Sequence, residues 1–123
     1  MNFKTGKFLL ELQSDPIVTQ LYATGDATGS GWTNSPPPSQ MFTRVTNGLF
    51  RITLPFTSGK LYKFLSTLGA WQPQFGGTSS TGGALGANYG GSSDPAAIPT
   101  PALAGNYMIE VNFLNNTYTV VKQ

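Results

Sequence analysis

Apolar side chains occupy every second position in three segments of this chain. Residues 50–54 alternate Phe, Ile and Leu with Arg and Thr, and the same period runs through residues 61–65 and 107–113. Successive side chains of a β-strand point to opposite faces of its sheet, so this period predicts strands with one buried face. Lys63, which lies between two aromatic residues, is therefore predicted to point away from the aromatic face of its strand.

Further strands complete the predicted architecture. Residues 117–121 are predicted to return as the partner of residues 107–113 after a tight turn at Asn115-Asn116, because Asn tolerates positive φ. Residues 18–23 are predicted as another strand. No stretch keeps a helical apolar period free of Gly and Pro, so no helix is predicted. Short strands and frequent turns favour an all-β fold, an immunoglobulin-like antiparallel β-sandwich.

Two segments are predicted to be loops. Residues 35–39 contain three consecutive prolines, a run that is locally stiff and extended. Residues 76–105 are rich in Gly, Ser, Ala and Pro. Because a structureless loop of that length is uncommon within a compact domain, we expect it to contain one short strand or turn near Ala84 to Tyr89.

The two ends of the chain resemble each other. Residues 2–13 and 112–123 share Asn-Phe at the start, Gln at the end and a two-residue turn in the same place. We interpret residues 1–13 as the closing hairpin of a preceding module, or as an N-terminal strand, and residues 14–123 as the complete module. A tandem array of such modules would gain avidity for a polymer. The alternative is that any two β-hairpins look alike over so short a span.

Composition narrows the functional classes. The chain has 123 residues, the size of one domain, and only 10% of them are charged. The net charge of +2 is spread along the sequence without a basic run, which argues against a nucleic-acid partner. No apolar run is long enough to span a membrane. The first residues lack the apolar core of a signal peptide, so we expect either a cytosolic protein or an excised piece of a longer exported one.

Catalytic side chains are scarce. Cysteine and histidine are both absent, which removes thiolate chemistry, the commonest general base and the commonest metal ligand. The five acidic residues show no metal-ligand spacing, and we predict neither a metal nor a cofactor. Asp26 and Asp94 suit turns and Glu110 suits the solvent face of a strand, whereas a glycosidase needs two carboxylates across one bond. The chain is therefore predicted not to be an enzyme.

The candidate binding residues are the two tryptophans and one lysine. Trp32 ends a glycine-rich loop, and Trp71 lies on a second loop after the strand that carries Lys63. Aromatic rings suit stacking on the apolar face of a pyranose, and a lysine ammonium donates hydrogen bonds to sugar hydroxyls. Gln72 adds a donor and an acceptor beside Trp71, and Tyr89 is either a third platform or an anchor of its loop.

A structural interpretation stands beside this one. Tryptophan is highly buried on average, so both rings would then belong to the core, and Lys63 would be an ordinary solvated lysine. The module would be a spacer, or an assembly domain that docks on a partner protein without binding sugar. Gln74 could add a donor and an acceptor in the same way as Gln72, but glutamines on loops are usually solvated.

Four segments resemble the modules of SusE/SusF-type outer-membrane lipoproteins. They are Leu-Tyr-Ala-Thr-Gly-Asp-Ala-Thr-Gly-Ser-Gly-Trp (21–32), Tyr-Lys-Phe (62–64), Trp-Gln-Pro-Gln-Phe-Gly-Gly (71–77) and Ile-Pro-Thr-Pro-Ala-Leu-Ala-Gly-Asn-Tyr-Met-Ile-Glu-Val-Asn (98–112). The match runs in the order of the family's segments. Phe75 departs from the pattern, since a tyrosine is expected there.

The resemblance implies a non-catalytic, immunoglobulin-like module that holds starch-like α-glucan at the surface of a Gram-negative bacterium. The parent protein would be lipid-anchored in the outer membrane, beside a TonB-dependent transporter. Carried over residue by residue, Trp32 and Trp71 would be the aromatic platforms and Lys63 the basic residue that contacts hydroxyls.

Overall fold

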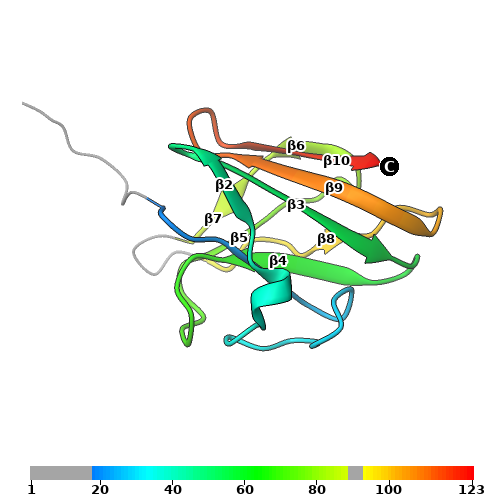
Figure 1. Cartoon of the computed structure of the whole chain (residues 1–123), viewed down its shortest axis with the longest axis horizontal. Coiled ribbons are helices and arrows are strands. Elements are labelled where there is room, and N and C mark those ends of the chain that lie inside the picture. The colour runs from blue at the N-terminus through cyan, green and yellow to red at the C-terminus, as the bar shows by residue number, and fades with distance from the viewer. Residues whose placement is uncertain (1–17, 89–92) are drawn as a thin grey trace, which may run out of the picture.

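Two antiparallel sheets stack face to face in the computed structural model, which describes residues 18–88 and 93–123 (Figure 1). The first sheet has the strand order β1 (Tyr22–Thr24), β4 (Leu61–Leu65), β5 (Gln74–Gly76) and β7 (Gly86–Ala87), and β8 (Ile98–Pro99) pairs with the start of β4. The second sheet has the order β2 (Thr43–Thr46), β3 (Leu49–Phe56), β9 (Gly105–Asn112), β10 (Thr117–Lys122) and β6 (Gly82–Ala84). The predicted all-β, immunoglobulin-like β-sandwich is confirmed.

Strand β3 shows how the alternating sequence builds the second sheet. Phe50, Leu54 and Phe56 are buried, whereas Arg51 and Thr53 are exposed. The neighbouring strands repeat the pattern, and the residues that they bury are Tyr107, Ile109, Val111, Tyr118 and Val120. The predicted strand pair 107–113 and 117–121 is thus confirmed with slightly shifted ends. The predicted turn is confirmed as well, because Asn116 has a φ of 56°.

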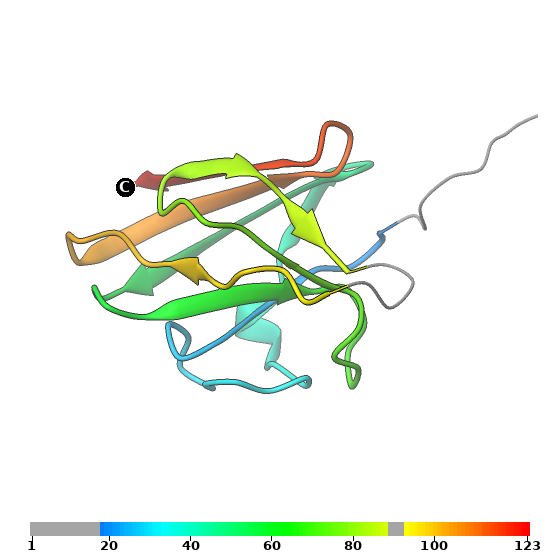
Figure 2. The same ribbon diagram turned by 180° about the vertical axis from the view of Figure 1, so that it is seen from behind.

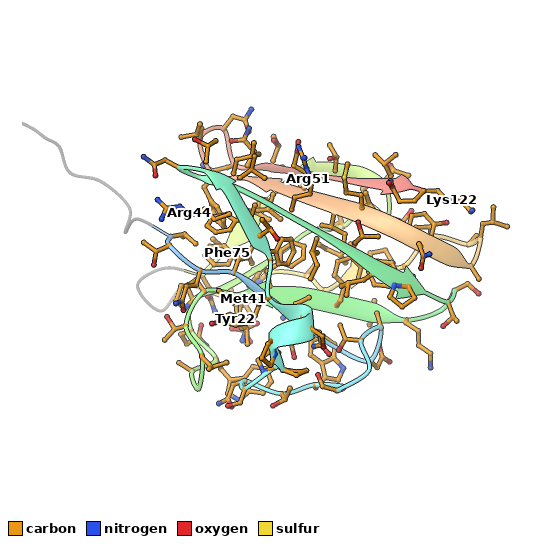
Figure 3. The ribbon with its side chains drawn as sticks, in the orientation of Figure 1. Tyr22, Met41, Arg44, Arg51, Phe75 and Lys122 are labelled. Atoms are coloured by element: carbon orange, nitrogen blue, oxygen red, sulfur yellow. The ribbon has the colours of Figure 1, made fainter. Side chains whose placement is uncertain are left out.

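Aromatic side chains fill the space between the sheets. The ring centroids of Phe56 on β3 and Tyr62 on β4 lie 4.8 Å apart, and Phe75 on β5 packs edge-on against Phe113 at 5.0 Å. Burial of each such ring stabilises the fold by about 2–3 kcal/mol. Phe75, labelled in Figure 3, is fully buried. This position, where a tyrosine was expected, therefore serves the core and not the surface.

One hydroxyl in this core lacks a partner. Tyr62 is fully buried, and its hydroxyl makes no hydrogen bond within the described residues. Burial raises the pKa of Tyr62 well above its ordinary value of 10.0. Burial also raises the pKa of Tyr118, although the Ser79 N–H, which donates to the Tyr118 hydroxyl oxygen at 3.1 Å, acts to lower it. Both phenols are therefore held neutral by the fold.

The prediction of a strand over residues 18–23 is wrong in its bounds. The observed strand, β1, covers Tyr22–Thr24. Tyr22 pairs with Leu65, the last residue of β4, so the chain before Tyr22 has no ladder partner in that strand. Residues that favour strands, such as Val18 and Thr19, do not form one where the neighbouring strand ends.

The glycine-rich region 76–105 holds more structure than its composition predicts. The expected short strand near Ala84 to Tyr89 is present as β7, but β6 and β8 were not predicted (Figure 2). These strands are only two or three residues long, too short to show alternation. Glycine is needed where the chain crosses itself, because a Cβ atom on Gly76 would lie 2.1 Å from the carbonyl oxygen of Ala96.

Two further strands escaped prediction for different reasons. All four residues of β2 are exposed, as expected of an edge strand that contacts solvent on both faces, so no apolar period marks it. All three residues of β5 are buried, and only one of them is a large apolar residue. Backbone hydrogen bonds to the neighbouring strands fix the conformation of both strands, so the pattern of their side chains does not predict it.

Little of the described chain is helical. Its one helix is the three-residue 3-10 helix η1 (Pro38–Gln40), which begins at the last proline of the run predicted to be extended. Within residues 18–88 and 93–123, no helix has the length and hydrophobicity that a membrane crossing requires. Residues 1–13, interpreted as a hairpin of a preceding module, lie outside the described residues.

Candidate functional site

Both tryptophans lie at the surface of the molecule. Trp32 is 46% exposed and Trp71 is 40% exposed. The structural interpretation required both rings to be part of the core, and the structure contradicts that requirement. Large rings that remain half exposed are typical of surfaces that a ligand or partner covers.

The backbone on both sides of Trp32 is fixed. Gly31 pairs with Gly25 across the loop, and the Gly25 N–H donates to the Gly31 carbonyl oxygen at 3.2 Å. The Thr24 hydroxyl donates to the carbonyl oxygen of Thr33 at 2.7 Å and accepts the N–H of Thr33 at 2.9 Å. Thr24 is a fully buried residue of β1. Trp32 therefore extends from a segment that is tied to the first sheet.

The start of the same loop is fixed to β4. Gly25 has a φ of +133°, and a Cβ atom there would lie 2.4 Å from the carbonyl oxygen of Leu61, so only glycine fits. The Asp26 carboxylate accepts the Leu61 N–H at 2.7 Å, and the Ala27 N–H donates to the Leu61 carbonyl oxygen at 3.1 Å. Asp26 lies in a turn as predicted, and the backbone N–H that its carboxylate accepts belongs to a distant strand.

A buried glutamine supports the middle of this loop. Gln40, the last residue of η1, is almost completely buried. Its Nε2 donates to the carbonyl oxygen of Ala23 at 2.8 Å and to the Ser30 hydroxyl at 2.9 Å. A buried amide with both bonds made is costly to displace, so it holds the loop against β1.

The loop that carries Trp71 meets the loop that carries Trp32. Residues 25–35 follow β1 and residues 66–73 follow β4, and the two loops lie side by side at the lower edge of the molecule in both views (Figures 1 and 2). The Gly69 N–H donates to the backbone carbonyl oxygen of Asn34 at 2.6 Å. In return, the Asn34 side-chain Nδ2 donates to the Gly69 carbonyl oxygen at 3.2 Å. The structure thus brings the two predicted platforms onto bonded neighbouring loops.

Lys63 lies on the outer face of the first sheet. It is half-buried, whereas Tyr62 and Phe64 on either side are fully buried, so the predicted direction of its side chain is confirmed. Its backbone pairs with Thr24, the residue whose hydroxyl holds the Trp32 segment. Its Nζ donates to Gln74 Oε1 at 2.9 Å. The ammonium group is therefore positioned by a protein acceptor of the kind that a sugar hydroxyl would replace.

Asn88 is a part of this site that the sequence did not reveal, and Gln74 takes part differently from what was predicted. Gln74 is buried on β5, so the expectation that it is solvated is wrong. The side-chain oxygen of Asn88 accepts the Gln74 N–H at 2.5 Å, and its Nδ2 donates to Asp94 Oδ1 at 2.9 Å and to Gln72 Oε1. Asn88 is 1% exposed, and the sequence around it carries no signal that marks a buried amide.

The two weaker candidates have different outcomes. Gln72 is exposed beside Trp71, and its side-chain oxygen is occupied by Asn88, which leaves its amide nitrogen as the group to face a ligand. Tyr89 lies outside the described residues.

The carboxylates of the described chain are engaged separately. Asp26 accepts from the backbone of Leu61 and Asp94 accepts from Asn88, both at the first sheet. Glu110 lies on the second sheet and forms an ion pair with Arg51, with 2.6 Å between Oε2 and the guanidinium nitrogen. No group of three or more Asp, Glu, His or Cys side chains gathers within the described residues.

Comparison with protein-family models and with curated proteins finds no match to this chain. Among solved structures, the chain is similar to one described as "Ligand induced structure of AmyP-SBD". The TM-score is 0.54 at 21% sequence identity, and the match covers 90% of this chain and 77% of the other. Similarity at this level of identity shows a shared fold.

Proposed function

We propose that this chain is a non-catalytic carbohydrate-binding module that holds starch-like α-glucan oligosaccharides. One observation carries the proposal. Two half-exposed tryptophans extend from loops that are hydrogen-bonded to each other through Asn34 and Gly69, at the sheet whose outer face carries Lys63.

The chemistry of these groups suits a sugar chain. A pyranose presents a face of C–H groups that stacks on an indole ring, and each stacked ring removes apolar area from water. Its rim of hydroxyls would accept hydrogen bonds from the Lys63 ammonium, which now donates to Gln74. Gln72 would add a donor beside Trp71. No step of this binding needs a general acid, a general base or a metal.

The anchored backbone favours weak but ordered binding. An exposed platform buries little area and must order a flexible glycan, so we expect modest affinity. The bonds of Thr24 to Thr33 and of Asn34 to Gly69 hold both loops before a ligand arrives. This preorganisation lowers the ordering cost that would otherwise fall on the complex.

Two likenesses support α-glucan as the ligand. The similar solved structure belongs to a starch-binding domain. The segments that carry Trp32, Lys63 and Trp71 resemble SusE/SusF-type modules. On this resemblance we propose that the parent protein is displayed on the outer membrane of a Gram-negative bacterium, beside a TonB-dependent transporter that takes up the glucan.

Native affinity electrophoresis tests the proposal. The protein is run in gels with and without soluble starch, and a gel with a soluble β-glucan serves as the control. We expect retardation in the starch gel alone. Equal mobility in all three gels would contradict α-glucan binding and would favour the spacer or partner-docking interpretation of the fold.

A further inference from the structure

Asn34 and Gly69 form a two-bond contact between the tryptophan loops. One bond joins backbone to backbone, from the Gly69 N–H to the Asn34 carbonyl oxygen at 2.6 Å. The other runs from the Asn34 side chain to the Gly69 carbonyl oxygen at 3.2 Å. The side-chain amide thus supplies the donor that a second backbone N–H would supply across a strand pair.

This contact lies close to both tryptophans. Asn34 follows Trp32 by two residues, and Gly69 precedes Trp71 by two residues. In the part of the chain that the structure describes, these are the hydrogen bonds that join residues 25–35 to residues 66–73. The other anchors of the loops reach β1, β4, η1 or Asn88, or stay within one loop, as does the bond from the Ala70 N–H to the Thr67 carbonyl oxygen.

We propose that Asn34 is a positioning residue that fixes the spacing between Trp32 and Trp71, and that the site thereby favours oligosaccharides long enough to contact both rings. This inference rests on the proposed function. A chain that reaches both rings makes its second contact within the same complex, so its gain depends on a fixed span. A single sugar ring contacts one platform at a time and gains nothing from the spacing.

Asparagine has the shape and the donor that the contact needs. Aspartate is isosteric but cannot donate to the Gly69 carbonyl oxygen, and its charge is repelled by that oxygen. Alanine removes the side-chain bond without adding a charge. Ser35 provides a matched control, because it is the next residue of the same loop and its hydroxyl donates to Asn34 Oδ1 at 3.3 Å and does not reach Gly69.

Binding constants for a long and a short ligand test the selectivity. We expect Asn34→Asp and Asn34→Ala to raise the Kd for maltoheptaose about fivefold to tenfold and to leave the Kd for methyl α-glucoside within about twofold. Ser35→Ala should keep both values. An equal rise in both Kd values would indicate a general loss of structure. Unchanged Kd values for both ligands would show that Asn34 does not fix the spacing of the tryptophans. Either result overturns the inference.

A measurement without ligand separates this inference from the proposed function. The two indole N–H signals in a ¹⁵N–¹H spectrum are assigned with Trp32→Phe and Trp71→Phe. Asn34→Ala should shift or broaden the Trp71 signal and speed hydrogen exchange of the Gly69 amide, although the substitution is on the other loop. If the wild-type protein binds neither sugar, the proposed function and the ligand selectivity both fail. The spectrum still tests whether Asn34 positions the Trp71 loop. An unmoved Trp71 signal together with unchanged hydrogen exchange at Gly69 would contradict that role.

Discussion

The outer faces of the two sheets are built on opposite plans. At the first sheet, two half-exposed tryptophans lie on hydrogen-bonded loops beside a polar network of the half-buried Lys63 with the buried Gln74 and Asn88. At the second sheet, Arg51 and Thr53 of strand β3 are exposed to solvent. The side chains of the ion pair between Arg51 and Glu110 are also accessible to solvent, at 44% and 30%. Side-chain amides order the first surface, whereas the second is an ordinary solvated face.

Exposure alone does not explain this difference. Leu103 and Leu114 are 65% and 75% exposed, which is more than either tryptophan. Single exposed leucines are normal on protein surfaces. The tryptophan loops differ because neighbouring residues anchor the backbone, which makes their exposed apolar area available in a fixed arrangement. The comparison teaches that fixed, ordered exposure, and not exposure alone, distinguishes the face proposed to bind sugar.

The largest effect is expected from Asn88→Asp. The new carboxylate would face Asp94 and the oxygen of Gln72 without a donor, which should lower the free energy of unfolding by about 3 kcal/mol near neutral pH. Urea unfolding measures this change, and much of it should disappear as the pH falls toward about 4, because burial beside Asp94 raises the pKa of the new carboxyl in the folded state. Asn115→Asp, on the exposed hairpin of the second sheet, is the matched control and should stay within about 0.5 kcal/mol.

Trp71→Ala should weaken sugar binding at the first sheet. Loss of one stacking face removes about 2 kcal/mol of binding free energy, on the order of a 30-fold rise in the Kd for maltoheptaose. Isothermal titration calorimetry measures the affinity, and circular dichroism checks that the domain remains folded. Leu114→Ala serves as the control on the second sheet. A folded Trp71→Ala variant with wild-type affinity would remove Trp71 from the site.

Lys63→Met tests the polar part of the same face. Methionine keeps most of the apolar stem but cannot donate to a hydroxyl or to Gln74. We expect about 1 kcal/mol weaker binding, or about a fivefold rise in Kd, and a fall of about 1 kcal/mol in the free energy of unfolding, because the buried Gln74 loses its donor. Calorimetry on the folded variant provides both quantities. Stronger binding by the variant would mean that the lysine opposes the ligand.

Tyr62→Phe examines the core that both faces share. Removal of a buried hydroxyl without a partner should leave the free energy of unfolding unchanged or raise it by about 1 kcal/mol. The raised pKa of Tyr62 means that its contribution is complete below the unfolded pKa near 10.0 and is lost as the pH rises above that value. Alkaline pH should therefore destabilise the variant less than it destabilises the wild type. A variant with a lower free energy of unfolding than the wild type at neutral pH would show that the hydroxyl has a partner.

The smallest effect is expected on the second sheet. Arg51→Ala breaks an ion pair that remains exposed to solvent, so the free energy of unfolding should fall by about 0.5 kcal/mol. The Kd for maltoheptaose should not change, because the residue lies on the other sheet. A measurable loss of affinity in this variant would contradict the separation of the two faces.

The sequence predicted what depends on local pattern. Alternation marked β3, β4, β9 and β10 and therefore the sandwich, and glycine-rich loops marked where Trp32 and Trp71 lie. It missed the contacts between segments distant in the chain. Asn34 bonds to Gly69, which lies 35 residues further along the chain, and Asn88 bonds to Gln72 and Gln74. No local pattern of apolar and polar residues indicates such partners. Burial of Gln74 likewise follows from the strand that lies beside it.

A titration of the wild-type protein with maltoheptaose, followed at both indole N–H signals, tests the central claim most directly. If Trp32 and Trp71 form one α-glucan site, both signals should shift along saturable curves with the same Kd, and cellohexaose should move neither. Movement of neither signal, or of one signal alone, would contradict a shared site on the two bonded loops.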